Sequence, residues 1–474
     1  MSNKGGQGFD LFSPLMEGVV EVFQNGIDLA VKFLGGKFQS AITFKNKQRG
    51  MRVDNSMLLD KKQAVEVDDL GWSINQNGLY KLRYLKPHLH TFIIGASGWG
   101  KTNLLNILME DNLKNGRPII FIDPKGTKES LKHFQELCRK YQRPCHVFSE
   151  HSPGLKKYGQ FSSMDADQAY IMIMRSFDWG KSPNEYYLSR SRKALKQVLD
   201  YLYSTKKKFG LHEVYQELEA KFPIKETEGL RTQLYLLVTS SFGPIFDISN
   251  EESFINLEKV WEERSCLYIG VSTMGYQTLA KTVGKMFVSE LQTLAHNIGV
   301  RLDTQEEAIK NSIGIFIDEG GSVLFPDFID LANKARSSGI NLTVSVQSYS
   351  DMEMVSESEI LMKQLMESFS NWFVQRQLNS ENAEKLASMF GTYLSEKKTV
   401  MTDGGSESSK GSLREAYEYF CHPDILKSIN IGQSLLLTFN PKDIHLLNIR
   451  NAKATQNYQE RPKEKVFKDY LGER

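Results

Sequence analysis

Residues 91–106 read TFIIGASGWGKTNLLN: a short apolar run, a glycine-rich turn and a second apolar stretch with helical spacing. The turn matches the pattern GxxxxGK[ST] in the strand–loop–helix setting that this pattern requires. Glycines let the backbone curl so that successive N–H groups point at phosphate oxygens, and the N-terminus of the next helix is positive. We therefore predict a phosphate-binding loop. Its predicted nucleotide-binding residues are Gly95, Ala96, Ser97, Gly98, Trp99, Gly100, Lys101, Thr102 and Asn103.

A second strand should bring a carboxylate to the same phosphates. Lys101 is expected to reach the β- and γ-phosphates, and the Thr102 hydroxyl to ligate Mg²⁺. Residues 313–317 form a nearly continuous apolar run, typical of a parallel strand buried on both faces, and Asp318 and Glu319 follow it. We predict that Asp318 holds Mg²⁺ together with Thr102. Glu319 is the predicted general base for the attacking water.

The predicted cofactors are ATP and Mg²⁺. Many P-loop GTPases recognise guanine through an Asn-Lys-x-Asp motif, which this chain lacks: Asn333 and Lys334 are followed by Ala335 and Arg336. The carboxylate pair also favours hydrolysis over transfer of the phosphoryl group to a small acceptor.

A third strand is predicted at residues 341–346, and Gln347 follows it. Strands in this position bring a polar side chain to the γ-phosphate, so Gln347 is a candidate catalytic sensor; a plain strand-end amide is the alternative. Residues 332–339 before it predict a helix end closed by glycine. Arg336 in this segment is a candidate arginine finger, although a cation near a helix C-terminus is also favourable for dipole reasons alone.

Spacing along the chain predicts an insertion. Roughly 200 residues separate Thr102 from Asp318, whereas a βαβ unit takes about 30. Three apolar stripes with helical spacing predict that the insertion is all-α. Glycine- and serine-rich residues 402–412 predict a polar loop. The predicted domains are an N-terminal attachment region at 1–79, an α/β nucleotide-binding domain with a central, mostly parallel sheet at 80–180 and 251–450, the all-α insert at 181–250 and a C-terminal tail at 451–474.

Composition leaves the partners open. The formal net charge is +2 and 40% of the residues are hydrophobic, which is ordinary for a globular protein, so a nucleic-acid partner must be argued from local features. The 4 cysteines lack metal-ligand spacing and indicate free thiols in a reducing compartment. No stretch reaches the ~18 continuous apolar residues that a membrane-spanning helix needs. Residues 11–34 instead predict an amphipathic helix that packs on this chain or a partner, or lies on a membrane surface.

The set of motifs resembles the type IV coupling proteins, the TraD/TraG-type motor ATPases of conjugation and type IV secretion, which are relatives of the FtsK and HerA translocases. The resemblance covers roughly residues 80–445 and includes FIIGASGWGKT, FIDPKG, EYY at 185–187, FIDEGG, KARSSGINLTVSVQS and GSLREAYEYFCHPDILKSINIGQSLLL. FIDPKG, the position of the insert and ARSSGI followed by Gln347 are the more discriminating features. Family members commonly begin with transmembrane helices, which are not expected here.

The resemblance implies a RecA-like fold in a homo-oligomeric ring, expected to be a hexamer. The implied partners are single- or double-stranded DNA, a relaxase-type nucleoprotein or secreted protein, and membrane components of the secretion channel. The implied location is the cytoplasm, peripheral at the inner membrane through a partner. The matching residues are Lys101 and Thr102 for Walker A, Asp318 and Glu319 for Walker B, Gln347 for the polar sensor, Arg336 for the arginine that reaches a neighbouring subunit's γ-phosphate, and Arg376 for a further cation near the subunit interface.

Several functions are compatible with these features. The leading hypothesis is a ring motor that couples ATP hydrolysis to movement of nucleic acid or nucleoprotein toward a secretion pore. The alternatives are an ATPase that recruits protein effectors without threading DNA, a HerA- or FtsK-type DNA translocase in DNA processing or defence, and a nucleotide-gated scaffold. Glu319 argues against the last of these, because a scaffold needs no general base.

Overall fold

The computed structural model describes residues 68–86, 88–149, 157–180, 185–206, 208–248, 253–272, 277–322, 326–356, 359–403 and 406–452. The predicted amphipathic helix at 11–34 lies outside these ranges, as does nearly all of the predicted C-terminal tail. The chain divides into a large compact unit, Val53–Leu386 with Pro423–Arg474, and a small one whose described part lies within Ala387–His422.

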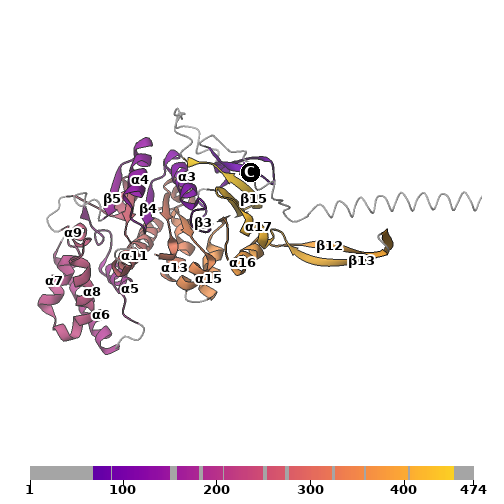
Figure 1. The fold of residues 1–474 in the computed structure, drawn as a ribbon. Coiled ribbons are helices and arrows are strands. Elements are labelled where there is room, and N and C mark those ends of the chain that lie inside the picture. The colour runs from indigo at the N-terminus through magenta and orange to yellow at the C-terminus, as the bar shows by residue number, and fades with distance from the viewer. Residues whose placement is uncertain are drawn as a thin grey trace, which may run out of the picture. The chain divides into compact units, whose positions relative to one another are not determined.

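The large unit is built on one sheet, which has 11 strands among the described residues (Figure 1). The strands from β11 to β5 run parallel to one another, and the remaining strands extend the sheet as antiparallel neighbours. The predicted central, mostly parallel sheet is therefore confirmed. From one edge to the other the strands are β2 (Gly78–Lys81), β1 (Asp69–Ser73), β15 (Lys442–Ile449), β14 (Gln433–Phe439), β11 (Asn371–Val374), β3 (Thr91–Ile94), β10 (Ile340–Val346), β9 (Ile313–Ile317), β4 (Ile119–Asp123), β8 (Cys266–Gly270) and β5 (Cys145–Ser149).

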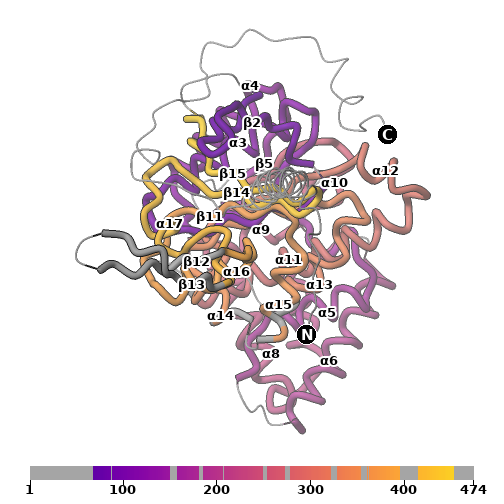
Figure 2. Tube along the Cα trace, turned by 90° about the vertical axis from the view of Figure 1, so that its right-hand side faces the viewer, coloured from indigo at the N-terminus to yellow at the C-terminus, as the bar shows by residue number. Residues whose placement is uncertain are grey.

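Helices cover both faces of this sheet. α3 (Lys101–Lys114) and α4 (Lys128–Lys140) lie on one side, and α11 (Gln277–Arg301), α13 (Pro326–Ala335) and α15 (Glu359–Ser368) lie on the other (Figure 2). The central strands β3, β9 and β10 are buried along their whole lengths for this reason. Burial on both faces explains the almost unbroken apolar sequences of β3 and β9, whereas β10 also buries Asn341, Thr343 and Ser345. Within the described ranges, no helix combines the length and the apolarity needed to cross a membrane.

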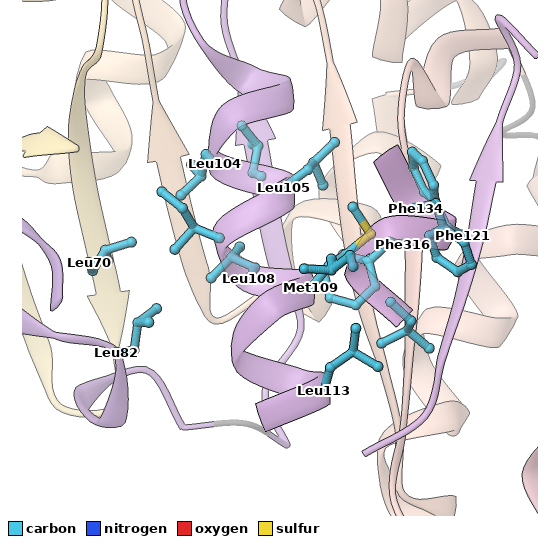
Figure 3. Close-up of a cluster of buried hydrophobic side chains, with 14 of the residues drawn as sticks. Leu70, Leu82, Leu104, Leu105, Leu108, Met109, Leu113, Phe121, Phe134 and Phe316 are labelled. Atoms are coloured by element: carbon cyan, nitrogen blue, oxygen red, sulfur yellow. The ribbon is translucent and has the colours of Figure 1, made fainter. Parts of the chain in front are cut away.

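One apolar cluster joins α3 to the sheet (Figure 3). Helical spacing places its α3 members on one face, toward Phe316 of β9 and Phe121 of β4. Burying each such side chain contributes roughly 1.5–3 kcal/mol, so the helix that begins at the glycine-rich loop is firmly fixed to the strands. The α3 residues in the cluster include Leu104, Leu105, Leu108, Met109 and Leu113.

The helical insertion begins after the edge strand β5 and ends before its neighbour β8. Short strands β6 (Lys157–Tyr158) and β7 (Phe254–Ile255) pair in parallel and hold the two ends of the insertion together. α6, α7 and α8 pack on one another, and their leucine stripes are buried. These helices lie within the predicted 181–250 segment, whose domain boundaries stay a prediction. The helices of the insertion are α5 (Ala166–Ser176), α6 (Glu185–Thr205), α7 (Leu211–Lys221), α8 (Ile224–Val238), α9 (Gly243–Phe246) and α10 (Leu257–Glu262).

The small unit contains the end of α16 (Ser380–Phe390) and an antiparallel ribbon of β12 (Thr392–Asp403) and β13 (Ser406–Tyr419). The prediction of a polar loop at 402–412 is wrong, because its described residues extend both strands of this ribbon. Hydrogen bonds between the strands satisfy the backbone even where side chains are small and polar, and local composition does not reveal that pairing.

Arg450 fixes the end of β15 to two layers of the large unit. Its side chain is fully buried; Nε donates to the Asp69 carbonyl oxygen at 2.9 Å and Nη2 lies 3.1 Å from Glu110 Oε2 on α3. Glu110 Oε1 also accepts hydrogen bonds from Lys140 Nζ at 2.8 Å and Tyr141 OH at 3.0 Å. A buried guanidinium needs such partners, since an unpaired buried charge is strongly destabilising.

A second buried carboxyl group, Glu290 on α11, contacts the insertion. Its Oε2 accepts a hydrogen bond from Tyr158 OH at 2.8 Å and its Oε1 accepts one from the Leu257 N–H at 3.1 Å. Burial raises the pKa of Glu290 from 4.5 to about 8, although these two hydrogen bonds oppose the effect. A carboxyl whose pKa is raised on folding keeps its proton in the folded state, so its stability contribution is lost as the pH rises from 4.5 toward 8.

Replacing Glu290 by glutamine should remove this pH dependence. Above its ordinary pKa the buried carboxyl costs at most about 1.4 kcal/mol of folding free energy per pH unit. The Tm of the wild type should therefore fall relative to that of Glu290→Gln as the pH is raised from about 5 to about 8. Thermal unfolding across this range measures the difference, with the exposed Glu228→Gln on α8 as the control. Parallel pH profiles for the wild type and Glu290→Gln would contradict a buried neutral carboxyl.

Candidate nucleotide-binding site

Most of the predicted site residues follow the carboxyl ends of adjacent parallel strands. β3, β10, β9 and β4 are neighbours in that order, and their ends align so that Ile94 lies opposite Val346 and Ile317 lies opposite Ile122. The segments that follow these strands therefore meet at one edge of the sheet. They contain the loop from Gly95, then Gln347, then Asp318 with Glu319, and then Lys125.

The glycine-rich loop between β3 and α3 has a backbone that side chains would disfavour. Gly98 and Gly100 have φ values of +83° and +103°, in the left-handed region that glycine tolerates. The Gly95 N–H donates to the Val346 carbonyl oxygen at 3.2 Å and ties the start of the loop to β10. The loop is thus anchored at its base, and Gly98 at its tip is exposed.

Lys101 is buried against this loop. Its Nζ donates to the carbonyl oxygens of Gly95 at 2.7 Å and Ala96 at 3.0 Å. Burial lowers the pKa of Lys101; the negative charge of Asp318 opposes that change, and the positive charge of Lys125 adds to it. An anion at the loop would stabilise the charged ammonium, so this environment suits phosphate.

The Asp318 carboxylate is nearly buried, at 5% exposure, between two hydroxyl groups. Ser345 Oγ donates to Asp318 Oδ1 at 2.5 Å, and Thr102 Oγ1 lies 3.5 Å from Asp318 Oδ2. A carboxylate and a hydroxyl are oxygen ligands of the kind that Mg²⁺ takes, with phosphate oxygens completing its shell. The residues present therefore fit Mg²⁺: Thr102 and Asp318 could hold it, and Ser345 orients the carboxylate.

Glu319 is held from both sides. Its φ of +47° is unusual for a residue other than glycine, and its N–H donates to Asp318 Oδ1 at 3.0 Å. Its Oε1 accepts a hydrogen bond from Gln347 Nε2 at 3.0 Å and forms an ion pair with Lys125 Nζ at 2.8 Å. Burial opposes protonation of Lys125, but the hydrogen bond to Glu319 and the nearby carboxylates together raise its pKa.

Lys125 and Ser345 are site residues that the sequence reasoning missed. Lys125 lies in FIDPKG just after β4, as Asp318 lies just after β9, so its position behind a buried apolar run was an available signal. Ser345 is inside β10, where nothing in the local sequence separates it from a plain strand residue. Its contact with Asp318 follows only from the pairing of β10 with β9.

Segments near the C-terminus cover the outer side of the loop. Trp99 Nε1 donates to the Ile429 carbonyl oxygen at 3.2 Å, beyond α17 (Pro423–Ser428), and the Arg376 guanidinium lies 5.1 Å from the centre of the Trp99 ring. The Ala96 N–H donates to the Arg376 carbonyl oxygen at 3.0 Å. Among the described residues, the buried Nε of Arg376 has no hydrogen-bond partner. Arg376 thus lies beside the loop of its own chain.

The Asn103 side chain is hydrogen-bonded to the segment that follows β15. Its Nδ2 donates to the Arg450 carbonyl oxygen at 2.8 Å and its Oδ1 accepts from the Ala452 N–H at 2.9 Å. Any contact of Asn103 with a phosphate would therefore come from its backbone N–H in the first turn of α3.

Arg336 lies at the opposite edge of the sheet. It begins the turn η3 (Arg336–Ser338) before the N-terminal end of β10, whereas Gln347 follows the C-terminal end of that strand. At about 3.3 Å per residue, the strand separates the two by roughly 20 Å. Arg336 is exposed. It lies near His90, just before β3: burial lowers the pKa of His90 to about 4, and the positive charge of Arg336 lowers it further. The structure does not bring Arg336 to the other predicted site residues of its own chain.

One part of the chain matches a known family model. Residues 312–427 match a family model described as the TraM recognition site of TraD and TraG. A stretch of 46 residues is 37% identical to an uncharacterized protein of Mycoplasma pneumoniae; the match covers 10% of this chain and 38% of that protein.

Solved structures share the fold. The bacterial conjugative coupling protein TrwB has a TM-score of 0.61 at 16% identity, covering 85% of this chain and 93% of that one. TrwB in complex with ADP and Mg²⁺ gives a TM-score of 0.60 at 16% identity, with 85% and 94% covered. VirB4 of Thermoanaerobacter pseudethanolicus gives 0.52 at 14% identity, with 82% and 97% covered. These similarities confirm the RecA-like P-loop fold, and the family-model match relates residues 312–427 to TraD and TraG.

Proposed function

We propose that this chain is an ATP-hydrolysing motor that assembles into a ring, expected to be a hexamer, and moves nucleic acid or nucleoprotein toward a type IV secretion or conjugation channel. The proposal rests on one observation: side chains suited to bind phosphate, to bind a metal and to accept a proton lie together at one edge of the sheet. The groups are those of Lys101, Thr102, Asp318, Glu319 and Gln347.

In this proposal each group has one task. Bound ATP with Mg²⁺ supplies the phosphoanhydride bond that is hydrolysed. Lys101 and the loop N–H groups bind the β- and γ-phosphates, and Thr102 and Asp318 hold the metal. Glu319 accepts a proton from the attacking water, and Gln347 contacts the γ-phosphate.

The choice of ATP rests on the sequence. TrwB structures are described in complex with GDPNP, a GTP analogue, and with ADPNP, an ATP analogue. The absence of an Asn-Lys-x-Asp motif here favours ATP.

The position of Arg336 supports a site shared between subunits. Roughly 20 Å of strand separates it from Gln347 of its own chain, so it would act on a neighbour's γ-phosphate.

The proposed partners are further copies of this chain, single- or double-stranded DNA, a relaxase-type nucleoprotein and membrane components of the channel. The proposed location is the cytoplasmic side of the inner membrane, through such a partner.

Delivery of protein substrates without DNA threading is the second candidate function. It is favoured by the match of residues 312–427 to a family model that is described by the recognition of a protein, TraM. A HerA- or FtsK-type DNA translocase outside secretion would share the same site.

Substitutions at the two chemical positions should have separable effects. Lys101→Ala should lose nucleotide binding, and its ATP turnover rate should fall by at least about 100-fold, because the phosphates lose their buried cation. Glu319→Gln should bind ATP normally but hydrolyse it about 10²–10⁴-fold more slowly. Steady-state ATPase assays and equilibrium binding of a nonhydrolysable analogue measure both, with the exposed Lys132→Ala as the control. Wild-type turnover in Lys101→Ala would refute the assignment of the site.

Arg336→Ala should bind ATP yet lose about 10³-fold or more in turnover, as expected for an arginine that stabilises the transition state. Mixing Arg336→Ala with Lys101→Ala should restore part of the activity, because the second protein donates its Arg336 to the first protein's intact loop. The exposed Arg139→Ala on α4 is the control. Mixtures no more active than their inactive components would contradict action between subunits.

The specific ATPase rate should rise with protein concentration, because assembly completes each site. Single-stranded DNA should raise it further if the cargo is nucleic acid. A titration of protein concentration with and without DNA measures both effects. A rate independent of concentration would argue against assembly, and the absence of DNA stimulation would favour protein delivery.

A further inference from the structure

We propose that Lys125 is a positioning residue that holds the Glu319 carboxylate in place for proton transfer. The inference rests on the proposed ATPase function and adds a residue from a fourth strand end to that site. Its ground is that one oxygen of Glu319 is held from both neighbouring strands, by Lys125 and by Gln347.

Strand order creates this arrangement. β9 lies between β10 and β4, so side chains that follow the two flanking strands can reach the residue that follows β9. Gln347 does so from β10 at 3.0 Å, and Lys125 does so from β4 at 2.8 Å. Both contacts are to Oε1. Within the described part of the chain, Oε2 accepts no hydrogen bond, so it is the oxygen that can take a proton.

The turn that carries Lys125 is itself held in shape. The Lys125 N–H donates to Asp123 Oδ1 at 2.9 Å, and Asp123 Oδ2 accepts a hydrogen bond from Tyr268 OH at 2.7 Å. The Gly126 N–H donates to the Asp123 carbonyl oxygen at 3.1 Å, and Gly126 has a φ of +57°, in the left-handed region that glycine adopts without strain. The lysine therefore extends from a tight turn whose backbone is anchored to β4 and β8.

The backbone of Glu319 is fixed independently of its side chain. Its N–H donates to Asp318 Oδ1 at 3.0 Å and lies 3.3 Å from Ser345 Oγ. The two donors to Oε1 consequently set the direction of the carboxylate and do not hold the chain itself.

Exposure indicates that the ion pair serves orientation more than folding. The Lys125 side chain is 47% exposed and that of Glu319 is 20% exposed. Pairs this accessible to water add little to stability, because solvent screens them and both side chains lose rotamer freedom. Within a site, however, a displacement of about 1 Å can lower a rate by about 100-fold.

The two donors differ in what else they can do. Nε2 of Gln347 carries two N–H donors, so contact with a γ-phosphate would divide this nitrogen between the phosphate and Oε1 of Glu319. Lys125 can keep hold of Oε1 at that moment. The expected division of work is that Gln347 responds to the nucleotide while Lys125 maintains the base.

Lys125→Met and Lys125→Arg test this role. Lys125→Met should lower kcat by roughly 10- to 100-fold with an unchanged KM and unchanged analogue binding, and Lys125→Arg should recover most of the rate because it keeps a cationic donor. Lys132→Met makes the same change at an exposed lysine of α4 and should match the wild type. In a Glu319→Gln background, Lys125→Met should have little further effect. Thermal unfolding should show that all variants fold.

A measurement without nucleotide tests the pair itself. With lysines labelled by reductive ¹³C-methylation, the resonance that disappears in Lys125→Arg should titrate at higher pH than exposed lysines and should move down in Glu319→Gln. A titration unchanged by Glu319→Gln, or a Lys125→Met protein with wild-type kcat, would overturn the proposal. An inactive wild type would overturn the proposed function and this inference with it, whereas an active wild type with an unimpaired Lys125→Met overturns the inference alone.

Discussion

Backbone hydrogen bonds between β10 and its two parallel neighbours align the carboxyl ends of β3, β10 and β9 at one edge of the sheet. Everything at the site depends on this register. A parallel strand shifted by one residue would turn its side chains to the other face, and Ser345 would no longer meet Asp318. The register is specified by burial, since each strand is buried along its length and packed on both sides. The hydrophobic core thus sets positions of polar groups to within the length of a hydrogen bond.

At that edge, Lys101 is paired within its own loop, and strand order determines the partners of Asp318 and Glu319. Lys101 turns back to the carbonyl oxygens of its own loop, Asp318 accepts from Ser345, and Glu319 is shared between Lys125 and Gln347. Few of these contacts add much folding free energy, because the groups were equally well paired with water before folding and the Lys125–Glu319 pair remains partly exposed. These contacts instead restrict the side-chain rotamers before a ligand binds. Little rotamer freedom then remains to be lost on phosphate binding, and the site is preorganised.

Features that the local sequence predicts are those carried by a short run of residues. The loop at Gly95, the carboxylates after residues 313–317 and the amide at Gln347 each directly follow a predicted strand, and the structure brings all three together. Features created by pairing between distant segments were missed: Ser345, Lys125, the antiparallel strands β1, β2 and β15, and the ribbon of β12 with β13. Arg336 shows a different limit. Its sequence context predicts a helix end, which the turn η3 agrees with, but a role in another subunit is a property of the assembly and is not encoded in the chain's own contacts.

The pairing of β6 with β7 lets the helical insertion change without disturbing the sheet. The two ends of the helical insertion, between β5 and β8 in the chain, are hydrogen-bonded to each other. The strands are therefore connected by a closed loop, whatever the length and sequence of the insertion. Closing a flexible loop twice as long costs only about 0.6 kcal/mol more, so the insertion can lengthen, shorten or be replaced at small cost to the core. The outward surface of these helices can therefore change while the edge of the sheet that carries the glycine-rich loop stays as it is.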